Sequence, residues 1–323
     1  MCYSAIIQQS LLTLARRFEA TIEWTAFENV LAQRAQGEKL DVPRALDQYI
    51  LGLTDAGARR SQELITQYRA RVEGEWQQEL FKQRKRLADR ERELAVRDTK
   101  TARKDAEIAK RKVQQLSGKV KKLRMAEVDE EDNRIFPRWY APVIVNDGGR
   151  RVIRPMRYQC RLAGKPSFYD KKFPGTYNAR RDSLEDYWAP AFGKHHGIVM
   201  VDSFFENVPR HLYERRELAS GEAEQNMVLH FNPNTGTPMI IACLWSHWEQ
   251  PGEASLDSFA AITDEPPQEI LITGHTRCII SIKEDNVRDW LSPQGVSKQR
   301  LQEILSDKVT PLYEHVVEQR EAA

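Results

Sequence analysis

The stretch from Arg59 to Met125 constrains the fold most, because it has no proline and is dense in Arg, Lys, Glu and Gln. Apolar residues recur in it at sevenfold and three-four spacings: Leu80, Leu87, Leu94, then Val113, Leu116, Val120 and Leu123. These spacings predict a long helix with a coiled-coil-like seam, interrupted around Thr101. We expect the helix to fold back on itself or to pair through residues 59–125 with a second copy or a protein partner.

The C-terminal part of this stretch, KRKVQQLSGKVKKLR, is strongly basic. A run of charge is usually a solvated helix face. The alternative is an arm that binds phosphate or a partner. The residues before it also have a helical pattern, since Ile7, Leu11, Leu14, Phe18 and Ile22 recur at spacings of three and four. We therefore predict a helical insert over residues 4–130.

After about Ile135 the pattern changes to short β-type runs separated by turns. APVIVNDGGRRVIRPM predicts a hairpin, because two apolar runs flank an Asn-Asp-Gly-Gly turn. Further strands are expected in GIVMVDSFF, NMVLHF, PMIIACLW, FAAITD and RCIISI, and a late helix in SKQRLQEILSDKVTPLYEHVV. The predicted fold class is α+β: residues 1–3 and 131–323 form a β-rich, barrel-like domain, and the helical insert is added to it.

Composition excludes some classes of protein and leaves others open. A hydrophobic content of 41% with 30% charged residues predicts a soluble globular chain, while the net charge of +2 argues neither for nor against nucleic acid. The four cysteines are scattered without zinc or disulfide spacing, so we expect no metal or other cofactor and a reducing cytoplasm. No apolar run is long enough to span a membrane, and the first residues do not form a signal-peptide core.

The chain opens MCYSA, with a cysteine directly after the initiator methionine. Removal of Met1 would leave a terminus that carries both a free α-amine and a thiol. Both groups are partly in their nucleophilic forms at neutral pH, since their reference pKa values are near 8 and 8.5. The simpler interpretation is a thiol that does nothing, because a lone cysteine is seldom catalytic.

Three other segments carry groups suited to chemistry. TYNARRD contains Asn178 and Arg180, VDSFFENV ends an apolar run at Glu206, and ITGHTRCIISI places His275 and Arg277 before a strand. Taken singly, each has an ordinary structural explanation. An acid at a strand end is usually a solvated edge charge, and a histidine before a strand is usually a turn residue.

Together with Cys2, these segments resemble the SRAP family, the SOS response-associated peptidases or abasic-site processing proteins. The family begins Met-Cys and carries an Asn-Ala-Arg motif, a Phe-Tyr-Glu-Trp-like motif and a late His-x-Arg. Those motifs stand here as Cys2, Asn178–Arg180, Phe204–Asn207 and His275–Arg277. PMRYQCR, IIACLW and DWLSPQ also match family segments, so the resemblance covers Met1–Cys2 and roughly Arg134–Val317.

The resemblance implies a protein that binds single-stranded DNA at an abasic site and joins Cys2 covalently to the ring-opened sugar aldehyde. Amine and thiol together would close a thiazolidine ring on that aldehyde. By analogy, Glu206 is a general acid or base, His275 shares its proton traffic, and Asn178 holds the amine or a sugar hydroxyl. Arg180 and Arg277 would grip phosphates, and Tyr158 would stack on a base or pack in the core. The family name adds autoproteolytic removal of Met1 by the same cysteine. A cytoplasmic protein, associated with the nucleoid when bound to DNA, is expected.

The sequence departs from the family pattern at several positions. Ser4 stands where the family has a phosphate-gripping Arg, and Asn207 and Tyr158 replace tryptophans. One hypothesis is that a helix starting near Ser4 presents Cys2 at its N-terminus, where the helix dipole would favour the thiolate. A second is that the basic stretch from Lys110 to Arg124 replaces lost DNA contacts.

Two alternatives to DNA cross-linking remain. One is a non-catalytic module that binds nucleic acid or a partner and assembles through its helical arm. The presence together of Cys2, Asn178, Glu206 and His275 favours chemistry over binding alone. The other is a protease acting on other proteins, for which no peptide-specificity element is visible.

Overall fold

The computed structural model describes residues 3–8 and 10–318 of the chain. It contains twelve strands that pair into one sheet. Their bounds are β1 Ser4–Ile7, β2 Thr21–Ile22, β3 Arg134–Ile135, β4 Tyr140–Asp147, β5 Arg150–Tyr158, β6 Asn178–Arg180, β7 His196–Pro209, β8 Asn226–Pro233, β9 Met239–Trp248, β10 Leu256–Asp264, β11 Cys278–Ile279 and β12 Tyr313–Val317. The combination of this sheet with long helices confirms the predicted α+β class.

The helices of the described chain range from one turn to 38 residues. They are α1 Leu11–Arg17, α2 Trp24–Ala35, α3 Arg44–Leu51, α4 Arg59–Val96, α5 Lys100–Arg124, α6 Tyr169–Lys172, α7 Arg210–Tyr213, α8 Gln268–Leu271, α9 Val287–Leu291 and α10 Lys298–Ser306. Contacts divide the chain into two compact units. Unit 1 comprises residues 1–27, 40–49 and 129–323, and unit 2 comprises residues 28–39 and 50–128.

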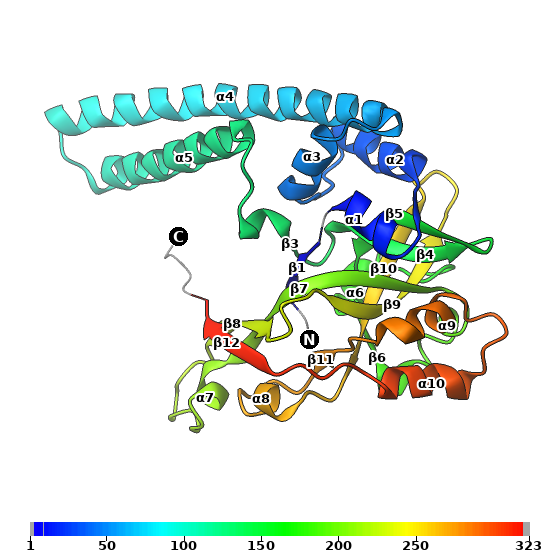
Figure 1. Cartoon of the computed structure of the whole chain (residues 1–323). Coiled ribbons are helices and arrows are strands. Elements are labelled where there is room, and N and C mark those ends of the chain that lie inside the picture. The colour runs from blue at the N-terminus through cyan, green and yellow to red at the C-terminus, as the bar shows by residue number, and fades with distance from the viewer. Residues whose placement is uncertain (1–2, 9, 319–323) are drawn as a thin grey trace. The chain divides into compact units, whose positions relative to one another are not determined.

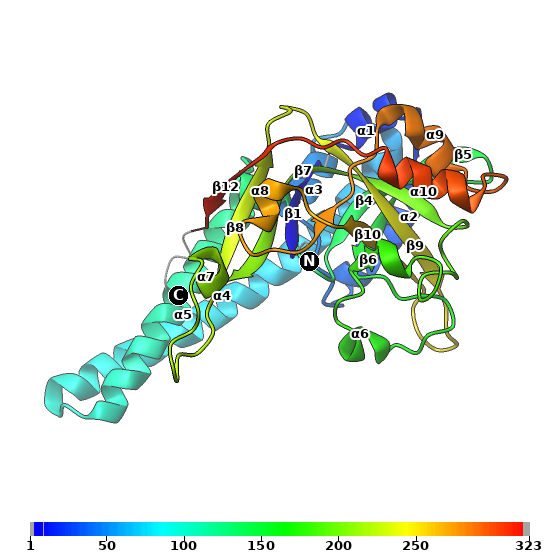
Figure 2. The same ribbon diagram turned by 90° about the horizontal axis from the view of Figure 1, so that it is seen from below.

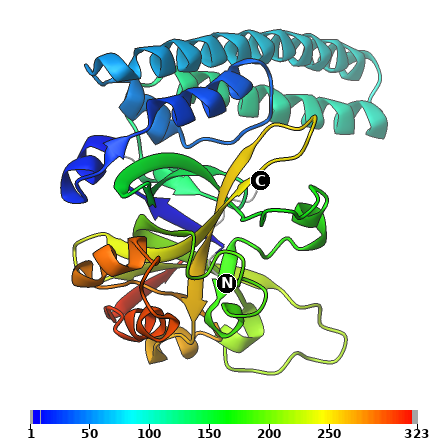
Figure 3. The same cartoon turned by 90° about the vertical axis from the view of Figure 1, so that its right-hand side faces the viewer.

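The sheet of unit 1 is closed through strand β9. The strands run in the order β11, β10, β5, β4, β7, β1, β3, and β9 pairs with both β7 and β10. Strands β10, β5, β4, β7 and β9 therefore form a ring of pairings, which corresponds to the barrel-like body expected from the sequence. Figure 3 shows β9 and β10 running side by side in yellow. Helices α9 and α10 lie together in orange and red in Figure 2.

The predicted hairpin is confirmed as β4 and β5, which pair from Tyr140 opposite Arg157 to Asp147 opposite Arg150. Its turn requires glycine, because Gly148 and Gly149 have φ angles of 58° and 84°. The buried core inside the sheet is built from alternate residues of the long strands. On β7, for example, Phe204 and Val208 are fully buried, and Phe204 stacks on Phe231 of β8 with 5.3 Å between the ring centroids.

The prediction of a helix from Ser4 onward is wrong at both ends of that segment. Residues 4–7 form strand β1, which pairs with β7 and β3, and residues 21–22 form β2; only α1 between them is helical. All four residues of β1 are buried. A strand buried on both faces shows no alternation, so its apolar run cannot be distinguished from a helix by spacing. Residues 4–27 accordingly cluster with the sheet of unit 1.

The late helix is shorter than predicted. Helix α10 ends at Ser306, and Tyr313–Val317 forms β12, which pairs with β8. Pro311 prevents a helix from continuing through this segment to Val317, because proline interrupts helical hydrogen bonding and disfavours helical geometry in the residue before it.

Unit 2 is dominated by α4 and α5, which fold back on each other as a helical hairpin (Figure 1). The chain breaks at Arg97–Thr99, slightly before the predicted interruption, because the Thr99 side chain accepts a hydrogen bond from the Ala102 N–H at 3.1 Å and caps α5. The α5 face that packs inward carries Ala102, Ala109 and Val120. Arg86 and Arg90 of α4 both bind Asp105 of α5, which lowers the pKa of that carboxyl to about 2.

Candidate functional site

Glu206 lies on β7 in the same inward-facing row as Phe204 and Val208, and it has no exposed surface. A carboxyl in such surroundings loses the hydration that stabilises its charge. Burial accordingly raises its pKa from 4.5 to about 8. From the sequence alone, Glu206 has the pattern of a solvated charge at the end of a strand. In the structure, β7 continues past it to Pro209, so the carboxyl lies within the strand.

His275 reaches Glu206 from the loop between α8 and β11. Its Nε2 lies 3.2 Å from Glu206 Oε2, and its Nδ1 lies 2.7 Å from the backbone oxygen of Arg277. The loop needs glycine at position 274, because the φ of Gly274 is 89° and an added Cβ would lie 2.7 Å from Leu212 Cβ. Burial lowers the pKa of the imidazole from 6.5 to about 4.

The partners of the two His275 ring nitrogens indicate where the hydrogens lie. A carbonyl oxygen only accepts, so His275 Nδ1 carries a hydrogen and donates it to Arg277. In the neutral imidazole, Nε2 then carries no hydrogen and can accept the proton of the Glu206 carboxyl, whose Oε2 lies 3.2 Å away. Both shifted pKa values agree with this neutral pair at pH 7. The pair is poised to transfer one proton between carboxyl and imidazole.

Asn178 lies on β6 and is 5% exposed. β6 runs parallel to β10, with Asn178 opposite Ala261 and Arg180 opposite Thr263. The Asn178 Oδ1 accepts a long hydrogen bond from Tyr158 Oη at 3.5 Å. Its Nδ2 has no hydrogen-bond partner within the described part of the chain. A buried amide nitrogen of this kind is available to donate to a bound molecule.

Tyr158 is placed differently from its predicted role on DNA. The ring is 3% exposed and packs against Phe259 and Tyr177, with centroid distances of 5.2 and 5.5 Å. A DNA base cannot stack on a ring that is almost fully buried. The alternative that Tyr158 packs in the core therefore fits its position. What Tyr158 offers the site is its hydroxyl, which holds the side chain of Asn178.

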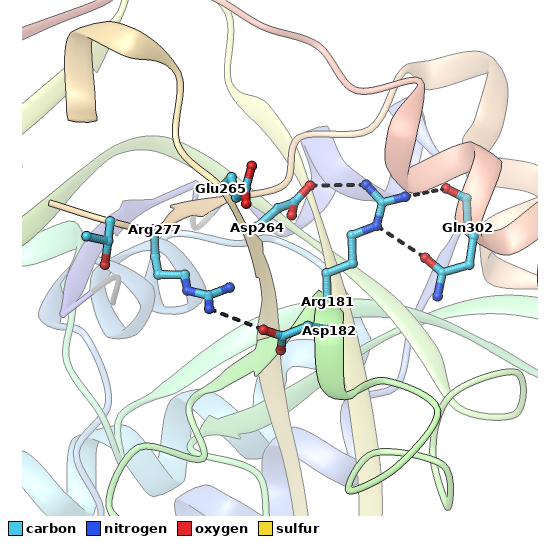
Figure 4. Close-up of a pocket in the computed structure, with 7 residues that line it drawn as sticks. Arg181, Asp182, Asp264, Glu265, Arg277 and Gln302 are labelled. Atoms are coloured by element: carbon cyan, nitrogen blue, oxygen red, sulfur yellow. Dashed lines mark hydrogen bonds and ion pairs between the residues drawn. The ribbon is translucent and has the colours of Figure 1, made fainter. Parts of the chain in front are cut away.

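Arg180 and Arg277 converge on a single carboxylate, that of Asp182. Arg180 Nη2 lies 2.5 Å from Asp182 Oδ2, and Arg277 Nη2 lies 3.3 Å from the same oxygen. Figure 4 shows Arg277 pointing at Asp182 in a pocket of about 470 Å³. Its lining residues are Arg181, Asp182, Asp264, Glu265, Thr276, Arg277 and Gln302. Asp182 was missed in the sequence, although it is the acid two residues after the Asn-Ala-Arg motif.

The neighbouring Arg181 has a structural task. Its guanidinium binds Asp264 Oδ2 at 3.1 Å and the backbone oxygen of Gln302 at 3.0 Å, and so ties β10 to α10 (Figure 4). Of the two consecutive arginines, Arg180 is therefore the more available to a ligand, since its side chain is 54% exposed.

Arg134 is a second residue that the sequence did not single out. Its Nε donates to Ser4 Oγ at 3.0 Å, and its guanidinium lies 3.5 Å from the centroid of the Phe205 ring. Glu131 and Glu318 both pair with it. A guanidinium is thus present beside Ser4, but it is buried and neutralised. It stabilises the β1–β7 region and does not offer a free phosphate site.

Cys2 lies outside the described residues. Tyr3, which follows it in sequence, donates its backbone N–H to the Phe205 carbonyl at 3.0 Å, one residue from Glu206. The hypothesis that a helix dipole activates Cys2 is wrong, because β1 begins at Ser4. The described cysteines are all buried, and burial raises the pKa of Cys160 and Cys278 to about 12. Such thiols are protonated at neutral pH and poorly reactive.

Two kinds of feature are absent from residues 3–8 and 10–318. No group of three or more His, Cys, Asp or Glu side chains there is arranged to hold a metal ion. No helix in the same residues has the length and apolar character needed to cross a membrane.

The solved structures that are similar to this chain include three proteins from bacteria. A protein from Bacteroides thetaiotaomicron is 15% identical, with a TM-score of 0.46 over 58% of this chain and 78% of that one. A Bordetella bronchiseptica protein is 20% identical (TM-score 0.44; 60% and 90% covered). A phage-related protein from the same organism is 16% identical (TM-score 0.44; 58% and 82% covered). No curated protein matches the chain.

The sequence model of one family matches residues 96–320, which include Asn178, Glu206 and His275. This match spans more than half of the chain and the whole of the β-rich segment after α5. The chain therefore belongs to the SRAP family, the SOS response associated peptidases.

Proposed function

We propose that the protein captures abasic sites in single-stranded DNA by forming a covalent thiazolidine with Cys2, once Met1 has been removed. The observation that carries the proposal is the buried Glu206–His275 pair, 3.2 Å apart, beside the backbone of Tyr3. A protonated carboxyl at neutral pH is unusual and suits a general acid. In the cell, we expect a cytoplasmic protein that joins the nucleoid when it binds DNA.

The proposed reaction begins at the ring-opened sugar of the abasic site. The α-amine of Cys2 attacks the aldehyde carbon, and the carbinolamine that forms loses one water to give an imine. Glu206 supplies the proton on which the hydroxyl leaves, and it regains a proton from the iminium nitrogen as the imine forms. His275 Nε2, which carries no hydrogen, accepts from the protonated carboxyl and orients it. Cys2 Sγ then attacks the imine carbon, the nitrogen takes up the thiol proton, and the five-membered ring closes. In this scheme Asn178 Nδ2 donates to the sugar or to the amine.

The substrate-side test uses two single-stranded oligonucleotides of the same sequence. One carries a natural abasic site, and the other carries tetrahydrofuran, which has the same shape but no aldehyde. The proposal predicts a heat-stable slow band on a denaturing gel with the first oligonucleotide alone, from protein whose N-terminus has been checked by mass. A band with both would mean that capture does not use the aldehyde, and a band with neither would leave the proposed chemistry without support.

DNA binding in this proposal uses Arg180 and Arg277, and Asp182 competes with phosphate for both. We predict that Asp182→Asn tightens binding of lesion-free single-stranded DNA by roughly 3- to 10-fold, since a charged hydrogen bond contributes about 1.5–3 kcal/mol and part of that is recovered as hydration. Fluorescence anisotropy at fixed salt measures the dissociation constant.

Asp186→Asn is the matched control, because it removes the same charge from the segment after β6 and has no ion pair with either arginine among the described residues. An equal gain in both variants would show a general charge effect. Weaker binding by Asp182→Asn would mean that the carboxylate positions the arginines for DNA and does not compete with it.

Autoproteolytic removal of Met1 is the associated activity we propose, using the same cysteine. A non-catalytic module assembled through the helical hairpin is the second candidate, and the length of the α4–α5 hairpin favours it. The two candidates separate on the gel, because a binding module would shift DNA under native conditions only.

A further inference from the structure

Charge is segregated between the two units of the chain. Unit 2 carries 23 Lys and Arg against 14 Asp and Glu, a net charge of +9. Unit 1 carries 26 against 33, a net charge of −7. The nearly neutral total therefore conceals a basic helical unit and an acidic sheet unit. An acidic body does not attract a polyanion over distance, so any general attraction for nucleic acid has to come from unit 2.

The excess positive charge of unit 2 is concentrated in the second half of α5. From Ile108 to Ala126 there is no acidic residue, whereas α4 interleaves ten basic with seven acidic residues. A helix that only faces solvent is more stable with charges of both signs, because opposite charges at i,i+4 attract each other. Like charges so close together destabilise an isolated helix and call for a compensating partner.

Three of these cations lie on one exposed side of α5, where Lys121 also lines a groove with Leu80 and Arg84 of α4. Lys110, Arg111 and Lys121 are exposed, and Lys110 and Lys121 are eleven residues apart, which returns them to one face at a distance of roughly 16 Å. Ala109 faces inward and is fully buried. Gly118, nine residues or two and a half turns later, therefore lies on the opposite, outward side.

These side chains differ from the paired cations elsewhere in the hairpin. Arg86 and Arg90 bind Asp105, and Arg124 Nε binds Glu73 Oε1 at 2.7 Å. Across residues 3–8 and 10–318, neither Lys110, Arg111 nor Lys121 forms an ion pair with an acid. Gly118 adds a second observation. A mid-helix glycine costs about 1 kcal/mol, yet a Cβ there would meet nothing within 4 Å, so the packing of the hairpin does not require it.

We infer that the outward face of α5, made by Lys110, Arg111, Gln114, Gly118 and Lys121, binds the sugar–phosphate backbone of DNA. The lysines and the arginine neutralise phosphates, Gln114 donates hydrogen bonds, and Gly118 lets the strand approach the helix closely. This surface shares no residue with the Glu206 site. It recognises the negative charge of the DNA backbone and not the base sequence. It gives the helical insert a task as the part of the chain that first attracts the strand.

The character of the face favours DNA over a membrane or a protein. A helix that lies on a membrane presents large apolar side chains beside its lysines. Here the apolar residues of α5, such as Ala109 and Val120, are buried in the hairpin. A stable protein interface likewise needs an apolar centre, which this face does not have. Binding of a phosphate backbone needs only positive side chains that the backbone can reach.

The test compares two triple variants of the full chain, both of which remove three positive charges. Lys110→Gln, Arg111→Gln and Lys121→Gln together alter the α5 face. Arg59→Gln, Arg60→Gln and Arg92→Gln together alter exposed positions of α4. Glutamine keeps helix propensity close to that of lysine and arginine, and circular dichroism verifies helix content. The probe is a fluorescent 30-nucleotide single strand without a lesion, titrated between 50 and 300 mM NaCl.

We expect the α5 variant to lower the slope of log Kd against log salt by about 2, since each phosphate contact on a single strand contributes about 0.7. Its Kd at 100 mM NaCl should rise at least tenfold, while the α4 variant stays within about twofold of the unaltered chain. An unchanged slope in the α5 variant overturns the inference. Equal losses in both variants also overturn it, because they would reflect net charge alone.

Two further measurements separate this surface from other partners and from the proposed reaction. If the α5 variant lost binding to phosphatidylserine vesicles or to polyglutamate and kept its binding to DNA, the face would belong to another partner. Glu206→Gln should keep the full salt slope on lesion-free DNA whether or not covalent capture occurs. The inference on α5 therefore stands or falls independently of the proposed function.

Discussion

Replacing Cys2 with alanine is expected to abolish the heat-stable complex with abasic-site DNA. Cysteine is the only standard residue whose terminus offers an amine and a thiol on adjacent carbons, so alanine can form the imine but cannot close the ring. An imine is hydrolysed on heating, whereas a thiazolidine carries no C=N bond for water to attack. The measurement is the denaturing gel with the abasic oligonucleotide, with Met1 removal checked by mass for each protein.

Cys2→Ser and borohydride provide the controls for this result. With borohydride present, imines are reduced to stable amines, so the alanine and serine variants should then give a band while each still has a free terminus. A variant that is trapped by borohydride but gives no band without it has kept its amine chemistry and lost only ring closure. A stable band from Cys2→Ala without borohydride would assign the linkage to another residue and refute the thiazolidine.

Some of the fold could be predicted because its signals are local. Gly148 and Gly149 indicate the β4–β5 hairpin in the sequence, because only glycine adopts their positive φ angles easily. The long helices are likewise marked by the absence of proline, and their break is marked by the capping side chain of Thr99. In each case the determinant is within a few residues of the structure that it specifies.

The remainder depends on contacts between distant segments. Strand β1 is a strand because β7 and β3 accept its hydrogen bonds on both sides, and nothing in Ser-Ala-Ile-Ile states this. The pairing of Asp182 with Arg277 joins residues 95 positions apart. Motif resemblance named Glu206 and His275, but the burial that shifts both pKa values is a property of the assembled sheet. The burial of Tyr158 against Phe259 and Tyr177 likewise depends on contacts between distant segments, so the sequence did not predict it.

The Glu206–His275 pair also makes stability depend on pH in a definite direction. A raised carboxyl pKa means that the folded state holds a proton that the unfolded state releases, so the contribution of Glu206 falls as pH rises from 4.5 to about 8. A lowered imidazole pKa means that stability is lost as pH falls from 6.5 toward 4. The two groups together favour the folded state most between about pH 4.5 and 6.5.

Glu206→Gln is expected to slow covalent capture by 10²- to 10⁴-fold, the usual contribution of a general acid. Glutamine keeps the size of the side chain, and its amide can still donate to His275 Nε2, so the fold should survive. It cannot release a proton to the leaving hydroxyl, so dehydration of the carbinolamine slows. The measurement is the initial rate of band formation at pH 7 with DNA in excess.

Asp202→Asn on the same strand is the matched control, because it neutralises a half-buried carboxyl of β7 and should leave the rate within about twofold of the unaltered protein. Urea unfolding at pH 5 and pH 8 verifies that Glu206 itself titrates. Between these values the glutamine variant should gain stability relative to the parent, by up to about 1.4 kcal/mol per pH unit. If that gain appears while capture continues at the parent rate, Glu206 is a buried structural acid, and the proton for dehydration comes from solvent. If both effects appear, the group that titrates in the fold is also the one that drives the chemistry.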